Sequence, residues 1–314
     1  MSGARGVLAV TIVVGAVSGT VTTPVPAPAP PAIIGRWNLT VPGLGFPACS
    51  WLEVHQSGDR TLVGHFVGWS GSARPISGVE FVDSVLRFAI PPQWERGDGD
   101  LRVEGTLRNG VLSGTIIDPA GQRLTWTGQR APDLRRTTPP QWASPITLFD
   151  GGDLSQWQTP TNSEWRVVEG ILTNAKAGGN LVTRESFTDF KLHIEFRYPK
   201  DGNSGVYLRS RYEVQIEDTP ASRVRTEGLG AIYGFLAPSE DAAKGPDQWQ
   251  TYDVTLIGRL VTVTLNGTTV INSREIPGIT GGALTCDEGA PGPLMLQGDH
   301  GPIEFRNIVL TPAM

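Results

Sequence analysis

Short runs in which apolar and polar residues alternate recur along the chain from residue 33 to its end. Alternation with a period of two, interrupted by Gly, Asn and Asp, is typical of half-buried antiparallel strands joined by hairpins. Asn109-Gly110 and Asn266-Gly267 each stand between two such runs and predict tight two-residue turns. The pattern therefore predicts an all-β protein.

The runs fall into two groups, which predict two β domains. Residues 33–130 contain about eight runs, enough for a small antiparallel β-barrel or sandwich. Their Gly35-Arg36-Trp37 opening is loosely similar to that of lipocalins. We expect this domain to have an accessory role in binding or spacing. His55 and His65 are expected to be ordinary surface or strand-edge histidines rather than ligands.

A segment without periodicity, residues 131–144, is rich in Pro, Thr and Arg and predicts a linker. Residues 145–314 follow as the second domain, where no amphipathic stretch could form a helix longer than a turn or two. We expect a two-sheet antiparallel sandwich of the jelly-roll type. Its clearest expected strands are 190–198, 205–208, 212–217, 250–257, 261–265, 268–271, 293–297 and 303–310.

The N-terminus has the pattern of an export signal. Arg5 precedes an apolar run, residues 7–17, which is shorter than the roughly 20 residues that span a bilayer. Small residues around Ser18 suit signal peptidase, so residues 1–18 predict a signal peptide; an N-terminal membrane anchor is the alternative. Residues 19–32 are Pro-rich and predict an extended spacer. We expect a secreted protein, in the periplasm or at the cell surface, with no membrane contact in its mature form.

Composition narrows the classes of function. The 314 residues include 26 Lys and Arg against 31 Asp and Glu, a net charge of −5. This balance argues against a nucleic-acid partner, which a basic surface would attract. Two cysteines, Cys49 and Cys286, are too few for a disulfide scaffold or a cysteine-based zinc cluster. They belong to different predicted domains, and whether they pair is left open.

Polar residues alternate with apolar ones on three expected strands of the second domain. Glu195 lies on the polar face of the first, Tyr207 and Arg209 on that of the second, and Glu213 and Gln215 on that of the third. If these strands are neighbours, the side chains form a polar groove suited to a neutral polyhydroxylated ligand. The alternative is a solvated sheet face with cross-strand ion pairs.

A tight Gly-Asp-His-Gly turn separates the last two expected strands. It displays Gln297, Asp299 and His300 at a sheet end, where loops commonly carry function. A histidine that titrates near neutrality is a natural acid or base. An ordinary turn histidine is the alternative interpretation.

Several motifs occur in order across residues 146–311. They include LFDG at 148–151, WRVVEGIL at 165–172, NSGVYLR at 203–209, YEVQI at 212–216 and LQGDHG at 296–301. With this set, the second domain resembles the 3-keto-disaccharide hydrolase domain family, a bacterial relative of concanavalin-like and laminin-G-like sandwiches. The first domain lies outside the resemblance.

The resemblance implies a hydrolase of glycosides that carry a ketone at sugar carbon 3. Such a ketone acidifies the hydrogen on carbon 2; a base removes it, the enolate expels the group on carbon 1, and water then adds. The hypotheses that follow place either Glu213 or His300 as the base with the other as the acid, and Arg209 and Gln215 as donors to the enolate. The side chains expected to bind the sugar are Glu195, Asn203, Tyr207, Asp218, Tyr233 and Gln297.

A non-catalytic, lectin-like carbohydrate-binding protein is the alternative function, because such sandwiches host both activities. The presence of Glu213, Arg209 and His300 in matching motifs favours the enzyme. The sequence has no diagnostic metal-ligand spacing, so no cofactor is certain and a divalent metal ion is left open. A carbohydrate partner is expected in either case, and the oligomeric state is open.

Overall fold

The computed structural model describes residues 31–42, 49–68, 73–92, 97–218 and 225–314. By its contacts the chain divides after Ala32, and residues 33–314 form one compact unit. The predicted signal peptide, residues 1–18, lies outside the described residues. In the described ranges, no helix is long and apolar enough to span a lipid bilayer.

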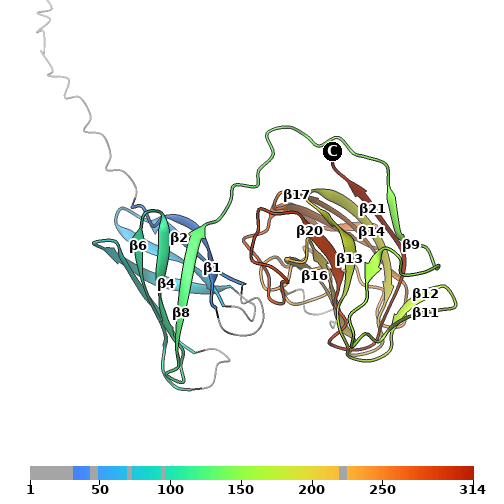
Figure 1. The fold of residues 1–314 in the computed structure, drawn as a ribbon, viewed down its shortest axis with the longest axis horizontal. Coiled ribbons are helices and arrows are strands. Elements are labelled where there is room, and N and C mark those ends of the chain that lie inside the picture. The colour runs from blue at the N-terminus through green and yellow to red at the C-terminus, as the bar shows by residue number, and fades with distance from the viewer. Residues whose placement is uncertain (1–30, 43–48, 69–72, 93–96, 219–224) are drawn as a thin grey trace, which may run out of the picture. The chain divides into compact units, whose positions relative to one another are not determined.

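The first eight strands close into an antiparallel barrel, because β1 pairs with both β2 and β8 (Figure 1). The prediction of about eight strands in a small barrel is confirmed. Asn109 and Gly110 form the turn between β6 and β7, with φ of 50° and 79°, which suits this Asn-Gly pair. The strands are β1 (Gly35–Thr40), β2 (Cys49–Ser57), β3 (Thr61–Val67), β4 (Arg74–Val82), β5 (Val85–Ile90), β6 (Leu101–Arg108), β7 (Val111–Ile117) and β8 (Arg123–Arg130).

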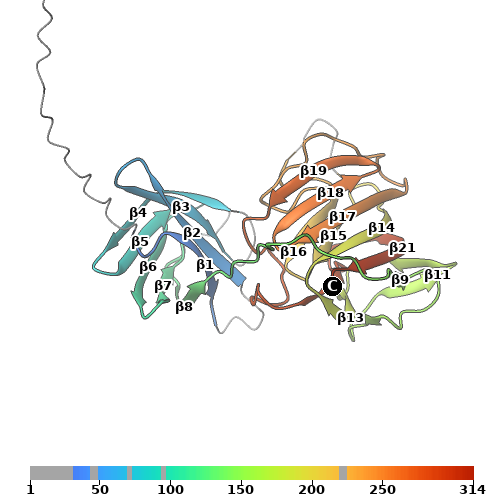
Figure 2. The same ribbon diagram turned by 90° about the horizontal axis from the view of Figure 1, so that it is seen from above.

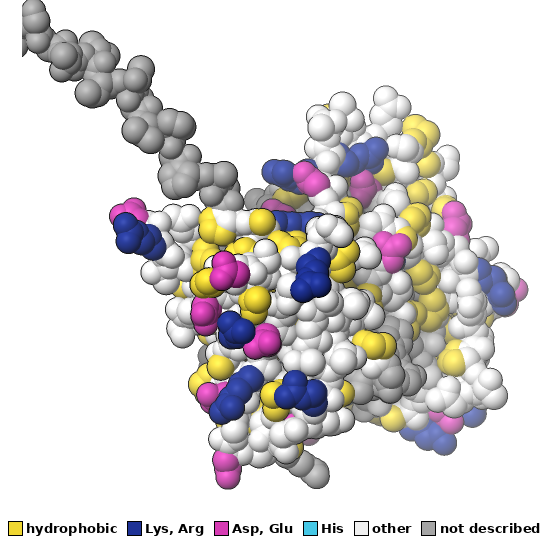
Figure 3. Space-filling model, turned by 60° about the vertical axis from the view of Figure 1, so that its left-hand side comes forward, with side chains coloured by type: hydrophobic (Ala, Val, Ile, Leu, Met, Phe, Trp, Pro, Cys, Tyr) yellow, Lys and Arg dark blue, Asp and Glu magenta, His cyan; other side chains and the backbone are white. Residues whose placement is uncertain are grey.

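The barrel has its own core, in which Trp37, Leu86, Leu112 and Trp126 are all buried. Burial alternates along β5 and β6, as the period of two predicts. On the face shown in Figure 3, Lys and Arg side chains are interspersed with Asp and Glu side chains rather than gathered in one basic patch.

The remaining strands form two antiparallel sheets. One has the order β10-β13-β20-β15-β16, and the other has the order β11-β12-β21-β14-β17-β18-β19, with β9 paired to β21. Figure 2 shows β19, β18, β17, β14 and β21 side by side in that order. The strands are β9 (Ile146–Phe149), β10 (Trp157–Gln158), β11 (Trp165–Val168), β12 (Ile171–Asn174), β13 (Leu181–Phe187), β14 (Phe190–Arg197), β15 (Asn203–Leu208), β16 (Tyr212–Glu217), β17 (Gln250–Ile257), β18 (Leu260–Leu265), β19 (Thr268–Glu275), β20 (Gly292–Leu296) and β21 (Ile303–Pro312).

The eight expected strands of this second domain are present as β14 to β21. The five strands before them, β9 to β13, were not among the clearest alternating runs. Four of these strands have only two or four residues, too few to show a period, and the fifth, β13, has seven. The all-β prediction is confirmed, and the jelly-roll order of connections stays a prediction.

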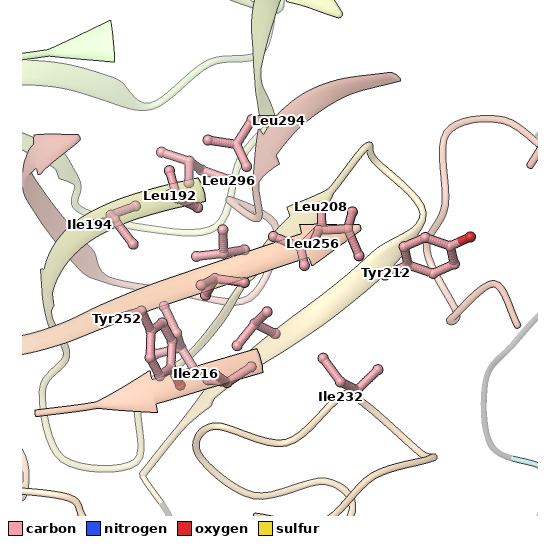
Figure 4. Close-up of a cluster of buried hydrophobic side chains, with 14 of the residues drawn as sticks. Leu192, Ile194, Leu208, Tyr212, Ile216, Ile232, Tyr252, Leu256, Leu294 and Leu296 are labelled. Carbon is pink, nitrogen blue, oxygen red and sulfur yellow. The ribbon is translucent and has the colours of Figure 1, made fainter. Parts of the chain in front are cut away.

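The apolar faces of the two sheets share one core. Leu192, Ile194, Tyr252 and Leu256 come from the larger sheet. Their partners from the smaller sheet include Leu208, Ile216, Leu294 and Leu296 (Figure 4). Since side chains alternate along each strand, the intervening polar residues of both sheets point away from this core.

A disulfide joins Cys49 of β2 to Cys286, with their Cα atoms 5.0 Å apart. This answers the pairing question that the sequence left open. Two polar contacts lie near it: Trp51 Nε1 donates to the carbonyl of Ile279 at 3.1 Å, and Arg36 pairs with Glu288 at 3.2 Å. The barrel and the sandwich are therefore linked covalently as well as by side chains.

Removing the disulfide in the double variant Cys49→Ser, Cys286→Ser should lower the free energy of unfolding by about 2–4 kcal/mol, because the bond restricts the unfolded chain. Urea unfolding of the variant and the wild-type protein, both without reductant, measures the difference. An unchanged unfolding midpoint would contradict the expectation.

Candidate active site

The polar face of β15 and β16 lies on the outer side of the smaller sheet. Tyr207 pairs with Glu213 across these strands, and Gly205 pairs with Gln215. Asn203 precedes them by the same alternation. The sequence prediction that Tyr207, Glu213 and Gln215 share one face agrees with this register.

This face is covered rather than solvated. The exposed fraction of Glu213 is only 3%, and Tyr207 and Gln215 are buried as well. Two later segments provide the cover. The Tyr233 amide donates to the carbonyl of Glu213 at 3.1 Å, and the Glu213 amide donates to Thr280 Oγ1 at 3.0 Å. The open groove expected from the alternation is thus a buried site beneath loops.

Burial gives the Glu213 carboxyl unusual acid–base properties. Desolvation raises its pKa to about 8, although a hydrogen bond from Tyr207 and the charge of His300 oppose this rise. Asp299 adds a repulsion that favours the protonated form. A carboxyl group with this pKa can take up and release a proton near neutral pH, as a general acid or base does.

The Glu213 carboxyl occupies the space that a side chain at position 205 would need. A Cβ on Gly205 would lie 2.9 Å from Cγ of Glu213 and closer still to Oε1. A glycine inside a strand often marks such a close approach. That signal was present in the NSGV motif and could have indicated Gly205 as a site residue from sequence.

Asp299 and His300 form an acid–base pair on the turn after β20. Nδ1 of His300 lies 2.6 Å from Oδ1 of Asp299. This hydrogen bond, more than the attraction of Glu213, raises the pKa of His300, while partial burial opposes it. About half of the His300 side chain is exposed. The imidazole therefore combines a favoured protonated form with access to an incoming molecule.

The turn that carries this pair is held by the side-chain amides of two asparagines that the sequence reasoning missed, the buried Asn174 and the partly buried Asn180. The Gly298 amide donates to Asn180 Oδ1 at 2.9 Å, and Asn174 Nδ2 donates to the Gly298 carbonyl at 2.8 Å. A Cβ on Gly298 would lie 2.6 Å from the Gly179 carbonyl oxygen. These contacts fix the backbone just before Asp299.

Further polar groups sit beside Glu213. Gln297 is buried, and its Oε1 has no hydrogen-bond partner among the described residues, which suits a ligand hydroxyl. Gln215 Oε1 accepts from the Ile216 amide at 3.0 Å. Tyr233 is half-buried, and burial followed by the charge of Glu213 raises its pKa.

Glu195 does not belong to this group. The groove required its strand to be a neighbour of β15, and this condition is not met, because β14 pairs with β17 and β21 in the other sheet. The chain crosses between the sheets after Arg197 instead of turning back as a hairpin. Glu195 accepts from Arg306 Nε at 2.7 Å and from Asn307 Nδ2 at 3.1 Å on the outer face of that sheet.

Arg209 also departs from its expected place. Both Arg209 and Ser210 have a φ of 53°, so the strand alternation ends before them. The guanidinium packs over the ring of Tyr212 and donates to Tyr212 Oη at 3.1 Å and to the Gly258 carbonyl at 2.9 Å. Because Tyr212 and Glu213 are consecutive on β16, their side chains point to opposite faces, and Arg209 lies on the side of Tyr212.

Asp218 supports a turn. Its Oδ2 accepts from the Asp201 amide at 2.9 Å, and its own amide donates to the Gly202 carbonyl. These bonds tie the end of β16 to the turn before β15. This carboxylate is therefore engaged with backbone, in contrast to that of Glu213.

Other features of the described residues lie apart from Glu213. A cavity of about 790 Å³ is lined by barrel residues such as Arg87 and Phe88 and contains no predicted site residue. Among the described residues, three potential metal ligands come within 4.8 Å of one another at Glu53, His55 and His65, also in the barrel. The sequence left a divalent metal ion at the sandwich site open, and the assay with a chelator described below tests it.

Replacing Asp299 by asparagine should lower the pKa of His300, because the hydrogen bond to the carboxylate favours the imidazolium. The His300 resonance, followed by NMR across the pH range, measures this shift. Asp253→Asn is the matched control, since Asp253 contacts His193 at 2.7 Å. Equal His300 pKa values in the wild-type protein and Asp299→Asn would contradict the assigned pairing.

The buried Glu213 carboxyl group and the nearby His300 are the kind of side chains that an enzyme uses for acid–base catalysis. The family model described as the 3-keto-alpha-glucoside-1,2-lyase-like domain matches residues 144–311, more than half of the chain. The chain belongs to this family, as the motifs in its second domain predict. Membership supports an enzyme that acts on glycosides.

Solved structures that resemble the chain include two proteins of Parabacteroides distasonis that are provisionally named glycosyl hydrolases. One is 31% identical, with 57% of this chain and 93% of that chain covered and a TM-score of 0.47. The other is 25% identical, with 54% of this chain and 98% of that chain covered and a TM-score of 0.42. A search of the curated proteins finds no match.

Proposed function

We propose that this protein is an exported hydrolase that cleaves the glycosidic bonds of 3-keto-glycosides by elimination across sugar carbons 1 and 2, followed by hydration. The observation that supports it most is the buried Glu213 carboxyl, with its pKa raised to about 8, facing Tyr207 and His300. Such a group is a stronger base than an ordinary carboxylate, which suits removal of a hydrogen from carbon.

In the proposed reaction, the Glu213 carboxylate takes the proton from carbon 2. The electron pair of that C–H bond forms the enolate of the 3-ketone, which collapses to a double bond between carbons 1 and 2 as the C1–O bond breaks. The His300 imidazolium gives its proton to the leaving oxygen. Water then adds across the double bond, which returns a proton to carbon 2 and leaves a free 3-keto-sugar.

The neighbouring groups have supporting roles in this proposal. The Tyr207 hydroxyl has one proton, which it donates to the Gly281 carbonyl at 3.0 Å or to the Glu213 carboxylate, and it lies beside the base in either case. The hydrogen bond from His300 to Asp299 raises the pKa of His300 and so favours its protonated form. Gln297 Oε1 accepts from a sugar hydroxyl. Gln215 lies close to Gln297, because Gly205 pairs with Gln215 on one side and its carbonyl accepts from the backbone amide of Gln297 on the other. Asn203 and Tyr233 complete the sugar-facing side.

The export part of the proposal rests on two observations. Residues 1–18 have the pattern of a signal peptide. The Cys49–Cys286 disulfide suits an oxidising compartment outside the cytoplasm.

Incubation of the signal-free protein with a 3-keto-glucoside and with its unoxidised parent tests the activity. We expect sugar release from the keto form alone, and parallel samples with a chelator show whether a metal ion is needed. Saturable binding of either glycoside without cleavage would overturn the enzyme in favour of a carbohydrate-binding module.

The pH profile tests the role of Glu213. The base acts only when deprotonated and the His300 acid only when protonated, so kcat/KM should pass through a maximum. Because the pKa values of Glu213 and His300 are both raised, the rate should still rise above about pH 6 and should fall at higher pH, where His300 loses its proton. An ordinary carboxylate would be fully ionised above about pH 6. The rate is measured from about pH 5 to about pH 9, after subtraction of the uncatalysed rate. A profile that is level from pH 6 upward would contradict the assignment.

A further inference from the structure

Two of the four histidines of the chain meet on the outer side of the barrel, together with a glutamate. Glu53 of β2 stands directly opposite His65 of β3. His55 follows Glu53 by two residues on β2, so the two side chains point to the same face. Each histidine by itself suggests a strand-edge residue, and only the register brings the three side chains together.

The spacing of these groups suits a metal ion. One donor atom from each of the three residues lies within 4.8 Å of the others, and Nδ1 of His65 is 3.5 Å from Oε2 of Glu53. In a tetrahedral zinc site, bonds of about 2.0–2.1 Å place neighbouring donor atoms about 3.3 Å apart. Donor atoms within 4.8 Å of one another would therefore have to approach by about 1.5 Å at most to bind one ion. The His55 and His65 rings already lie side by side, with centroids 6.1 Å apart and an angle of 28° between their planes.

The scaffold under the three residues is rigid. β2 and β3 pair continuously from Trp51–Val67 to Ser57–Thr61, which fixes the spacing of their Cα atoms. The backbones approach so closely that a Cβ on Gly64 would overlap the Glu53 carbonyl. The side chains themselves keep access to solvent, since about two fifths of Glu53 and of His65 is exposed. An ion could thus enter without rearrangement of the barrel.

We propose that Glu53, His55 and His65 bind one divalent transition-metal ion, with zinc as the best match. Two imidazole nitrogens and one carboxylate oxygen are donors that zinc accepts, and three protein ligands leave a coordination position for water or an outside ligand. As a plain surface ion pair, Glu53 and His65 would contribute little to stability. The proposed site lies in the barrel and does not depend on the proposed glycoside chemistry.

Zinc titration of the untagged, signal-free protein, stripped with a chelator and followed by calorimetry, tests the site. We expect one saturable event per chain. His55→Ala and His65→Ala should each weaken zinc binding at least tenfold, and Glu53→Gln should do so as well. His193→Ala is the matched control, because His193 lies in the sandwich beside Asp253; its affinity should equal that of the wild-type protein.

Cobalt supplies a second readout that does not depend on heat. Cobalt bound to nitrogen and oxygen donors in a four-coordinate site should give visible absorption in the wild-type protein that is absent from His65→Ala. Unchanged zinc affinity in both histidine variants would overturn the proposal, as would loss of binding in His193→Ala or no binding at all. Circular dichroism of each variant shows that a loss of binding is not a loss of fold.

Discussion

Replacing Glu213 by glutamine is expected to lower kcat/KM for a 3-keto-glucoside by about 10²- to 10⁴-fold, the range usually lost with a general base. Glutamine keeps the size and a hydrogen-bonding oxygen of the side chain but cannot take a proton. The rate of sugar release at several substrate concentrations measures the loss. A variant with more than half of the wild-type activity would remove Glu213 from the mechanism.

Glu195→Gln is the matched control for this variant. Glu195 is also a strand carboxylate, but it lies on the outer face of the other sheet in an ion pair with Arg306. An exposed ion pair contributes little to stability, so this variant should keep both its fold and its rate. Equal losses in the two variants would indicate a general effect on folding instead of chemistry.

The stability of Glu213→Gln has a predictable sign. The pKa of Glu213 is raised in the folded protein from 4.5 to about 8, so the folded state binds more protons than the unfolded state between these values. The contribution of this group to the free energy of unfolding of the wild-type protein therefore falls as the pH rises from 4.5 to about 8. Glutamine carries no charge, so at about pH 9 the variant should unfold at a temperature no lower than the wild-type protein.

Strand alternation predicted much of the site because side chains on a strand obey a period of two. Tyr207, Glu213 and Gln215 lie on one face as expected, since β15 and β16 are joined by a short turn and must be neighbours. The same reasoning failed for Glu195, because alternation defines a face but does not choose the neighbouring strand. That choice depends on where the chain crosses between the two sheets.

Two other features could not be read from the pattern. Arg209 has the residue type of an enolate donor, but its positive φ turns it away from the strand that precedes it. The burial of Glu213 depends on Tyr233 and Thr280, which belong to irregular segments without periodicity. The raised pKa follows from that burial, so the most informative property of the site is a product of tertiary structure.

The barrel contributes to this cover. Trp51 packs against the ring of Phe235 at 5.5 Å and donates to the Ile279 carbonyl. Phe235 lies two residues after Tyr233, and Ile279 immediately precedes Thr280. Trp51 thus contacts the same two segments that bury Glu213. The nearby Cys49–Cys286 disulfide holds Trp51 against these segments. A domain without predicted catalytic residues thereby supports the catalytic one.

Replacing Gly205 by alanine should lower kcat/KM by about 10²-fold, the cost of a misplaced catalytic group. The added methyl group would overlap the Glu213 carboxyl, and the end of that side chain moves more easily than the strands around it. The variant should therefore fold with a displaced base. Gly78→Ala in the barrel is the matched control, since a Cβ there meets no atom within 4 Å, and its rate should equal that of the wild-type protein.

A double-mutant cycle distinguishes this cause from general damage. If Gly205→Ala acts only by moving Glu213, then adding it to Glu213→Gln removes nothing further, because the base is already lost. The double variant should then be as active as Glu213→Gln alone, within about twofold. If the fold-losses in kcat/KM of the two single variants multiply in the double variant, position 205 affects the reaction through another group. Gln297 is one such group, because its backbone amide donates to the Gly205 carbonyl at 2.9 Å.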